Sequence, residues 1–249
     1  MAFKACERCE ANGTPGWLGG VGRLTKCDCL LAYEEKTRIA QRIEDSGLNK
    51  NYLDYDIKDY ISKSNKPNES LKVINNVISN VDAFVNEGGQ LYIWGNRNTQ
   101  KTSVISYLVR QVAVRNISIY YITMPQMIEA LMQAKDYHES DTTAQASSIK
   151  RRLEETDLLV VDNAFDPSKI YFSGKSTYKA TLLSSLFSYR NEQKCSNIFV
   201  ANVPRSGIDL DIFGESLPET LNRGCIELEF SDKLNENEMR SDVLKSLMV

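Results

Sequence analysis

The sequence lacks any apolar run close to the roughly 18 residues that a membrane-spanning helix needs. Its N-terminal residues also lack the apolar segment of a secretory signal, so we expect a soluble cytoplasmic protein without membrane contact. The sequence also has no excess of positive charge. Its net charge is −3 and its pI about 5.4, which excludes a generally basic protein that coats nucleic acid. Hydrophobic residues make up 42% of the chain and charged residues 25%, a composition that excludes a disordered or fibrous protein.

Histidine is nearly absent, and cysteine is distributed unevenly. His138 is the only histidine, and its polar surroundings predict an ordinary surface residue. Four of the six cysteines precede residue 30, as Cys6-x-x-Cys9 and Cys27-x-Cys29, and two close thiol pairs suit tetrahedral zinc. A segment this short has too little apolar area to fold without a metal. We therefore predict a zinc site at these four cysteines; the alternative is four reduced thiols on a flexible arm.

Changes in composition divide the chain into four parts. Residues 1–48 contain the cysteine-rich module and a helix expected from about residue 30 to 48. Residues 49–70 are polar and are interpreted as a linker. Residues 71–231 form the main domain, and residues 232–249 are a tail of mixed charged and apolar residues.

The main domain alternates between two kinds of apolar pattern. Short apolar runs that predict buried strands occupy residues 91–94, 117–123, 158–162, 197–201 and 226–230. Helical patterns lie between them, at residues 101–115, 125–135, 145–155 and 180–193. Buried strands separated by helices predict an α/β fold, with a five-stranded parallel sheet covered on both faces.

A candidate phosphate-binding loop follows the first expected strand. It fits the pattern G-x-x-x-x-G-K-[ST] and consists of Gly95, Asn96, Arg97, Asn98, Thr99, Gln100, Lys101 and Thr102. In such a loop, backbone N–H groups hold the phosphates, the lysine reaches the β- and γ-phosphates, and the threonine hydroxyl binds Mg²⁺. Gln100 replaces the second glycine, and if its position needs a positive φ, the Cβ costs roughly 1–2 kcal/mol. A chance match, or a loop that has lost nucleotide binding, remains an alternative.

Polar residues end two further strands. Asp162 closes the run at residues 158–162, where a P-loop ATPase places the carboxylate that supports Mg²⁺. The next residue is Asn163, and an amide cannot act as a general base. Asp166 could replace that acid only if the chain turns back toward the γ-phosphate. Asn202 follows the run at residues 197–201 and could orient the attacking water, while Arg223 lies just before the last strand, placed to reach a neighbour's nucleotide.

Together these residues resemble the AAA+ ATPases of the DnaC/DnaI helicase-loader group. The resemblance covers residues 71–230, and the stretch from Tyr120 to Met132 is similar to the family's second strand and following helix. A cysteine-rich module ahead of the core also resembles DnaI-type loaders. The degenerate positions Gln100 and Asn163 suggest a divergent or phage-encoded member, acting in a bacterium or a bacterial host.

The resemblance implies a set of roles. Lys101 and Thr102 would bind phosphate and Mg²⁺, Asp162 would be the Mg²⁺ acid, Asn202 sensor 1, and Arg223 an arginine finger acting between self-associated subunits. No separate lid domain is expected, and sensor 2 has no candidate. The implied cofactors are ATP or ADP, Mg²⁺ and Zn²⁺, and the implied partners are a DnaB-type replicative helicase and single-stranded DNA.

Three functions follow as hypotheses. The first is a nucleotide-dependent helicase loader that hydrolyses ATP weakly, because Asn163 replaces the usual acid. An IstB-type transposition helper shares the core but targets a transposase and DNA. A nucleotide-free pseudo-ATPase adaptor is the third.

Overall fold

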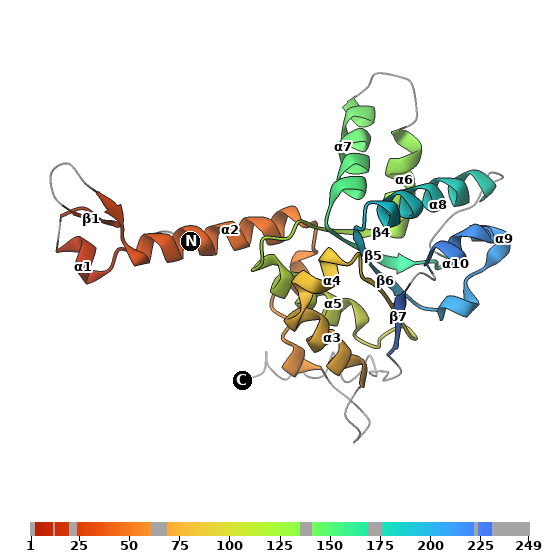
Figure 1. The fold of residues 1–249 in the computed structure, drawn as a ribbon, viewed down its shortest axis with the longest axis horizontal. Coiled ribbons are helices and arrows are strands. Elements are labelled where there is room, and N and C mark those ends of the chain that lie inside the picture. Colours follow the sequence, from red (N-terminus) through yellow and green to blue (C-terminus); the bar gives the residue numbers. More distant parts are fainter. Residues whose placement is uncertain are drawn as a thin grey trace, which may run out of the picture. The chain divides into compact units, whose positions relative to one another are not determined.

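The structure is a computed structural model that describes residues 3–11, 13–19, 24–60, 69–134, 141–168, 176–221 and 224–230. The chain forms two compact units, Met1–Asp45 and Ser46–Val249 (Figure 1). The residues after Phe230, where a tail without a lid is expected, lie outside the described part, as does His138. No helix in the described ranges is long and apolar enough to cross a membrane.

The first unit is a small hairpin followed by a long helix. Helix α1 spans Glu7–Glu10, strands β1 (Trp17–Leu18) and β2 (Thr25–Lys26) pair antiparallel, and α2 spans Asp28–Asp45. Helix α2 buries none of its residues, so the order of this unit has to come from the hairpin and its cysteines. Helix α2 begins two residues earlier and ends three residues earlier than the range of about 30 to 48 that the sequence pattern predicts.

The second unit is built on a five-stranded parallel sheet, as predicted. The strands are β3 (Gln90–Trp94), β4 (Ile119–Thr123), β5 (Leu158–Ala164), β6 (Ser196–Ala201) and β7 (Cys225–Glu229). Their order is β4-β5-β6-β3-β7, and all neighbours are parallel. The order places β3 between β6 and β7, so the loop after β3 lies between the carboxyl ends of these two strands.

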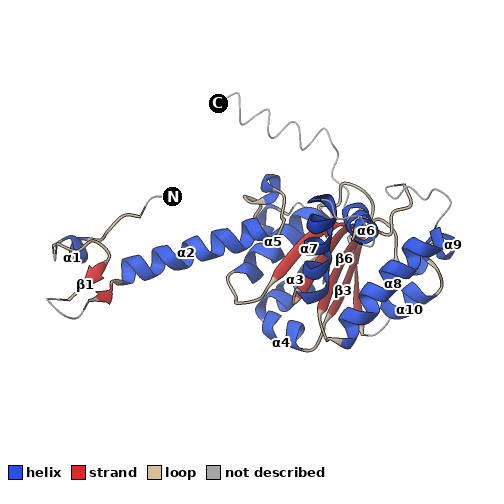
Figure 2. Ribbon diagram, turned by 90° about the horizontal axis from the view of Figure 1, so that it is seen from above, coloured by secondary structure: helices blue, strands red, loops and turns tan. Residues whose placement is uncertain are grey.

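Helices cover both faces of this sheet (Figure 2). They are α3 (Glu69–Ser79), α4 (Val81–Asn86), α5 (Lys101–Ala113), α6 (Met124–Gln133), α7 (Asp141–Glu155), α8 (Ser176–Glu192), α9 (Leu210–Phe213) and α10 (Ser216–Leu221). In Figure 2, α3, α4 and α5 lie on one side of the strands and α8, α9 and α10 on the other. Such two-sided cover is expected of strands that are apolar on both faces.

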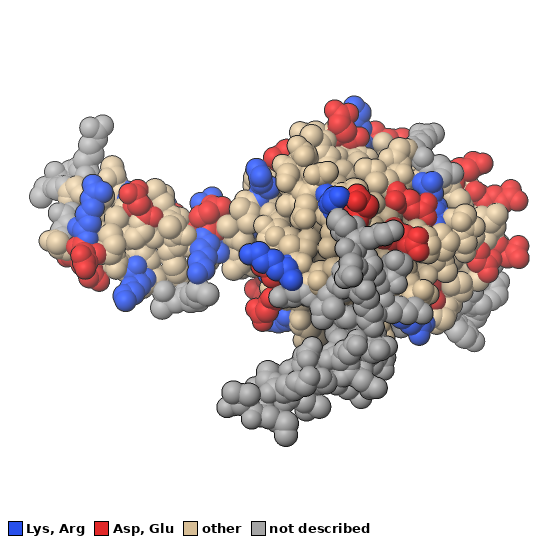
Figure 3. Space-filling model, turned by 90° about the horizontal axis from the view of Figure 1, so that it is seen from below, with Lys and Arg blue, Asp and Glu red and all other residues tan. Residues whose placement is uncertain are grey.

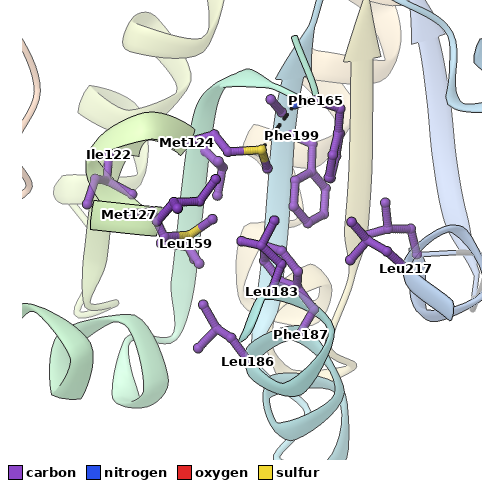
Figure 4. Packing of buried hydrophobic residues seen from close by; sticks show 14 of the residues in the cluster. Ile122, Met124, Met127, Leu159, Phe165, Leu183, Leu186, Phe187, Phe199 and Leu217 are labelled. Atoms are coloured by element: carbon purple, nitrogen blue, oxygen red, sulfur yellow. Dashed lines mark hydrogen bonds between the residues drawn. The ribbon is translucent and has the colours of Figure 1, made fainter. Parts of the chain in front are cut away.

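The core on the α6–α8 side is rich in aromatic rings (Figure 4). Phe199 on β6 lies 5.6 Å from Phe165 and 5.0 Å from Phe187 between ring centroids. Phe165 follows β5, is fully buried, and donates its backbone N–H to the sulfur of Met124 at 3.2 Å. Its φ of 55° is unusual for a bulky residue, so burial of the ring holds a strained turn directly after β5.

Residues 46–60 belong to the second unit and include the short helices η1 (Lys50–Tyr52) and η2 (Ile57–Asp59). Ser46 is fully buried, and its carbonyl accepts the backbone N–H of Tyr121 on β4 at 2.6 Å. Gly47 is required here, because its φ is +81° and a Cβ would come within 2.7 Å of the Tyr121 carbonyl. Ser46 and Gly47, which directly precede the segment interpreted as a linker, therefore pack on the edge of β4, and residues 61–68 of that segment lie outside the described ranges.

Candidate functional site: a phosphate loop with two carboxylates

The loop after β3 has the backbone of a phosphate-binding loop. It runs from Gly95 to Gln100, and α5 begins at Lys101. A Cβ on Gly95 would lie 2.0 Å from the Phe230 carbonyl, so the close approach of the chain after β7 excludes any larger residue. Asn98 and Gln100 have φ values of 64° and 61°. Gln100 thus occupies a left-handed position where the pattern has glycine, and the strain anticipated from the sequence applies.

Lys101 lies under this loop rather than in solvent. Its side chain is buried, and Nζ donates to the carbonyls of Gly95 (2.8 Å) and Asn96 (2.7 Å) and to the Thr99 hydroxyl (3.1 Å). Burial lowers the pKa of Lys101 to about 8, although the charge of Asp162 acts in the opposite direction. Oxygens of the loop itself hold the ammonium group. From this position the ammonium could turn to bind a phosphate.

The carboxylate of Asp162 is held by three donors from three segments. Oδ2 accepts the Thr102 hydroxyl at 3.2 Å and also the Tyr121 hydroxyl, and Oδ1 accepts the Asn163 backbone N–H at 2.7 Å. Burial and the adjacent charge of Asp162 raise the pKa of Tyr121, so this phenol is protonated and donates. Thr102 and Asp162 place two oxygens side by side, and oxygen is the donor atom that Mg²⁺ prefers. This pair therefore fits a magnesium site.

A second carboxylate, Asp166, joins the tip of β6 to the loop after β5. Asn202 Nδ2 donates to its Oδ2 at 3.0 Å, and Ser168 donates to its Oδ1 through the backbone (3.0 Å) and the hydroxyl (2.6 Å). Arg97 of the phosphate loop lies 3.8 Å away and also donates to the Ser168 hydroxyl at 3.3 Å. Burial alone would raise the pKa of Asp166, but the bonds from Ser168 and Asn202 outweigh it and hold the pKa below its usual value.

Residues of the loop after β3 and of the carboxyl ends of β5 and β6 line a cavity of about 330 Å³, a size within the usual range of ligand sites. Its lining includes Tyr52, Arg97, Asn98, Thr99, Gln100, Lys101, Thr102, Ser103, Asp162, Asn163, Val200 and Asn202. The structure thus brings together the predicted residues of the loop with Asp162 and Asn202. Tyr52 and Tyr121 were not predicted, because nothing in their local sequence connects them to the loop. Arg223 lies outside the described residues.

The four N-terminal cysteines converge in the first unit. Their sulfurs all lie within 4.8 Å of one another, with Cys6–Cys27 at 3.6 Å and Cys9–Cys29 at 3.5 Å. Tetrahedral zinc with Zn–S bonds of about 2.3 Å separates its sulfurs by about 3.8 Å, so the arrangement fits this metal. The Gly16 backbone donates to the Cys9 sulfur at 3.1 Å. A backbone hydrogen bond from Cys9 and the neighbouring Cys27 thiol lower the pKa of Cys6 to about 7, whereas burial and the surrounding thiols raise the pKa of Cys29 to about 12.

No model of a known protein family matches the chain, and no curated protein sequence matches it. Among solved structures it is similar to the DnaC helicase loader, with a TM-score of 0.59 and 19% identity over 74% of this chain and 100% of that one. The structure of DnaI gives a TM-score of 0.54 and 14% identity, covering 76% and 97% of the two chains. The replication initiator DnaA bound to AMPPCP and single-stranded DNA gives 0.57 and 15%, covering 81% and 57%. The chain therefore shares its fold with the DnaC, DnaI and DnaA structures.

Proposed function

We propose that this protein is a nucleotide-responsive loader of a DnaB-type replicative helicase. The observation that carries the proposal is the cavity beside Lys101, where the phosphate loop, Asp162 and Asn202 meet on an AAA+ fold. The likeness to the DnaC and DnaI structures supports the loader role among AAA+ functions. The cysteine module ahead of the core favours a loader over an IstB-type transposition helper.

Each residue of the cavity has a part in this proposal. The backbone of Gly95–Gln100 and the ammonium of Lys101 bind the phosphates of ATP or ADP. Thr102 and Asp162 hold Mg²⁺, which when bound neutralises charge on the β- and γ-phosphates. Asn202 touches the γ-phosphate or the attacking water, with its amide nitrogen directed by Asp166. The protein therefore distinguishes ATP from ADP at Asn202.

Hydrolysis is proposed to be slow, so that the protein works as a nucleotide-state switch. Asn163 lines the cavity where a catalytic acid is usual, and its amide cannot accept a proton. Asp166 is a carboxylate near the site, but its oxygens already accept bonds from Ser168 and Asn202. An adaptor that binds no nucleotide is the second candidate, favoured by Lys101 being fully engaged by loop oxygens.

The first unit is proposed to bind the helicase. Among its described residues, Trp17, Leu24 and Leu31 are large apolar side chains that are 38%, 55% and 45% exposed. A contiguous exposed apolar patch marks a docking surface, and these side chains are proposed to form one. Full-length protein with Trp17→Ala and Leu31→Ala should lose helicase binding. The matched control is Tyr178→Ala with Leu210→Ala, which removes exposed apolar groups from the second unit.

Arg223 is proposed to act on the nucleotide of a neighbouring subunit in a head-to-tail assembly. Such contacts generate rings or open spirals, and an arginine supplied in trans stabilises transition-state charge. Arg223→Ala should keep nucleotide affinity and lose ATP-dependent assembly. Unchanged assembly in this variant, measured by light scattering, would contradict the role.

The loader function itself is tested by helicase loading onto circular single-stranded DNA. Wild-type protein with ATP should increase the amount of DNA-bound helicase, and Lys101→Ala should abolish that increase while still binding the helicase. Equal loading with and without the protein would rule the function out. Equal loading by wild type and Lys101→Ala would favour the nucleotide-free adaptor.

A further inference from the structure

Tyr121 reaches the candidate magnesium site from outside the cavity, because it lies on β4, and no described residue of this strand lines the cavity. On β4, Thr123 pairs in register with Asp162, and Tyr121 precedes Thr123 by two residues. Residues two apart in a strand share one face of a sheet, separated by about 7 Å. The phenol spans this separation, and its hydroxyl donates to Asp162 Oδ2. The contact therefore depends on the register between β4 and β5.

The backbone of Tyr121 is fixed as firmly as its side chain. Its N–H donates to the carbonyl of Ser46, a fully buried residue that covers the free edge of β4. Gly47 lies so close to the Tyr121 carbonyl that a Cβ there would come within 2.7 Å. Tyr121 itself is 7% exposed. A donor anchored on both sides can hold its acceptor in one orientation.

The two side-chain donors to Asp162 Oδ2 have different chemistry. Thr102 is itself a candidate metal ligand, so its hydroxyl serves both the carboxylate and the ion. Tyr121 is a protonated phenol on the neighbouring strand β4. Among the hydrogen bonds of the described residues, its hydroxyl donates to the Asp162 carboxylate only. It can orient Asp162 without competing for the metal.

We propose that Tyr121 is a positioning residue that orients Asp162 to hold the Mg²⁺ of a bound nucleotide. The proposal rests on the proposed nucleotide-binding function. Groups that hydrogen-bond a metal ligand fix its geometry, and their removal typically costs 10–100-fold in metal affinity. Tyr121 thus sets the magnesium dependence of nucleotide binding while leaving the phosphate loop unchanged.

The test measures AMPPCP binding by calorimetry on the full-length protein, in EDTA and across a Mg²⁺ series. In Tyr121→Phe we expect the half-saturating Mg²⁺ concentration to rise about 10–100-fold, while affinity in EDTA stays within about twofold of wild type. The matched control is Tyr120→Phe, because Tyr120 is the adjacent tyrosine on β4, is equally buried, and packs its ring against Arg152 at 4.0 Å. It should leave both quantities unchanged. Thr102→Val removes the other side-chain donor to Asp162 Oδ2, which is also a candidate metal ligand, so this variant should lose the Mg²⁺ response.

Thermal unfolding without nucleotide separates a packing defect from a positioning role. Equal melting of the two phenylalanine variants, with a shifted Mg²⁺ response in Tyr121→Phe alone, is the expected result. A wild-type Mg²⁺ response in Tyr121→Phe, or an equal shift in Tyr120→Phe, would overturn the inference and leave the proposed function standing. Absence of AMPPCP binding by the wild-type protein would instead overturn the nucleotide-binding proposal and this inference with it.

Discussion

The amide nitrogen of Asn202 lies 3.0 Å from Oδ2 of Asp166, although the two residues follow different strands. A carboxylate only accepts hydrogen bonds, so this contact fixes which end of the Asn202 amide faces Asp166. The fully buried Phe165 folds the chain back after β5 and so brings Asp166 to the site. Because Asp166 already accepts three hydrogen bonds and its pKa lies below the usual value, it is poorly suited to take a proton from water.

Restoring an acid at position 163 should therefore accelerate hydrolysis. Asn163 has a φ of 51°, which aspartate tolerates better than most residues, so Asn163→Asp supplies a carboxylate with little added strain. Single-turnover ATP hydrolysis should rise at least tenfold, since a positioned base contributes roughly 10²–10⁴. Nucleotide affinity should stay nearly constant. Unchanged turnover in Asn163→Asp, together with complete loss in Asp166→Asn, would identify Asp166 as the base.

Zinc should bind the cysteine cluster at about one ion per chain. Cys9→Ser or Cys27→Ser should remove the metal and the order of the first unit, because α2 buries none of its residues and the unit has little other core. Cys195→Ser and Cys225→Ser are the matched controls, since these thiols lie outside the cluster. Elemental analysis and circular dichroism provide the measurement; a folded first unit without metal would contradict the assignment.

Nucleotide affinity should fall as the pH rises above about 8. The pKa of Lys101 is about 8 in the folded chain, below the value of about 10.4 for a free lysine. Binding that uses the ammonium should be constant below pH 8 and weaken up to tenfold per pH unit above it. In the same window the unfolded chain binds more protons, so the nucleotide-free fold should gain stability as the pH rises from 8 to 10. A Lys101→Met variant should lose both dependences.

Gln100→Gly should stabilise the protein by roughly 0.5–1 kcal/mol, the relief of left-handed strain less the added freedom of the unfolded chain. Gln100 already has a φ of 61° without nucleotide, so the strain belongs to the folding free energy. The control is Lys194→Gly, at a φ of 56° before β6 and outside the cavity lining. Urea unfolding compares the two. An affinity change in Gln100→Gly alone would show that the loop conformation also changes on binding; destabilisation of both variants would refute the strain argument.

The sheet was predictable because its signals are local. All five strands lie within two residues of their expected bounds, since buried parallel strands are continuous apolar runs. The loop between β3 and α5, with Lys101 at the start of the helix, was predictable from the spacing of Gly95, Lys101 and Thr102. Helices α7 and α8 begin four residues earlier than expected, at Asp141 and Ser176, because polar first turns carry no apolar periodicity.

The contacts within the site were less accessible to sequence reasoning. The bond from Tyr121 to Asp162 depends on the register between two strands, which no single strand specifies. Tyr52 reaches the cavity because residues 46–60 belong to the second unit, although the polar composition after residue 48 resembles a linker. Asp166 lies near the site because the chain turns back after β5 where Phe165 is buried. The burial of Phe165 depends on the packing of the whole core.

The face of the molecule drawn in Figure 3 carries charged side chains of both signs. On the face drawn in Figure 3, basic and acidic side chains of the described residues alternate rather than gather into one basic patch. The charges of the described residues on this face therefore do not identify a DNA-binding surface.

The central claim is tested most directly by measuring complex formation between the full-length protein and a DnaB-type replicative helicase. Analytical ultracentrifugation would compare the mixture with AMPPCP and Mg²⁺ against the mixture in EDTA. The account predicts a defined complex, heavier than the helicase alone, that is lost in the Trp17→Ala and Leu31→Ala variant and whose composition changes with nucleotide. Independent sedimentation of the two proteins under both conditions would contradict it.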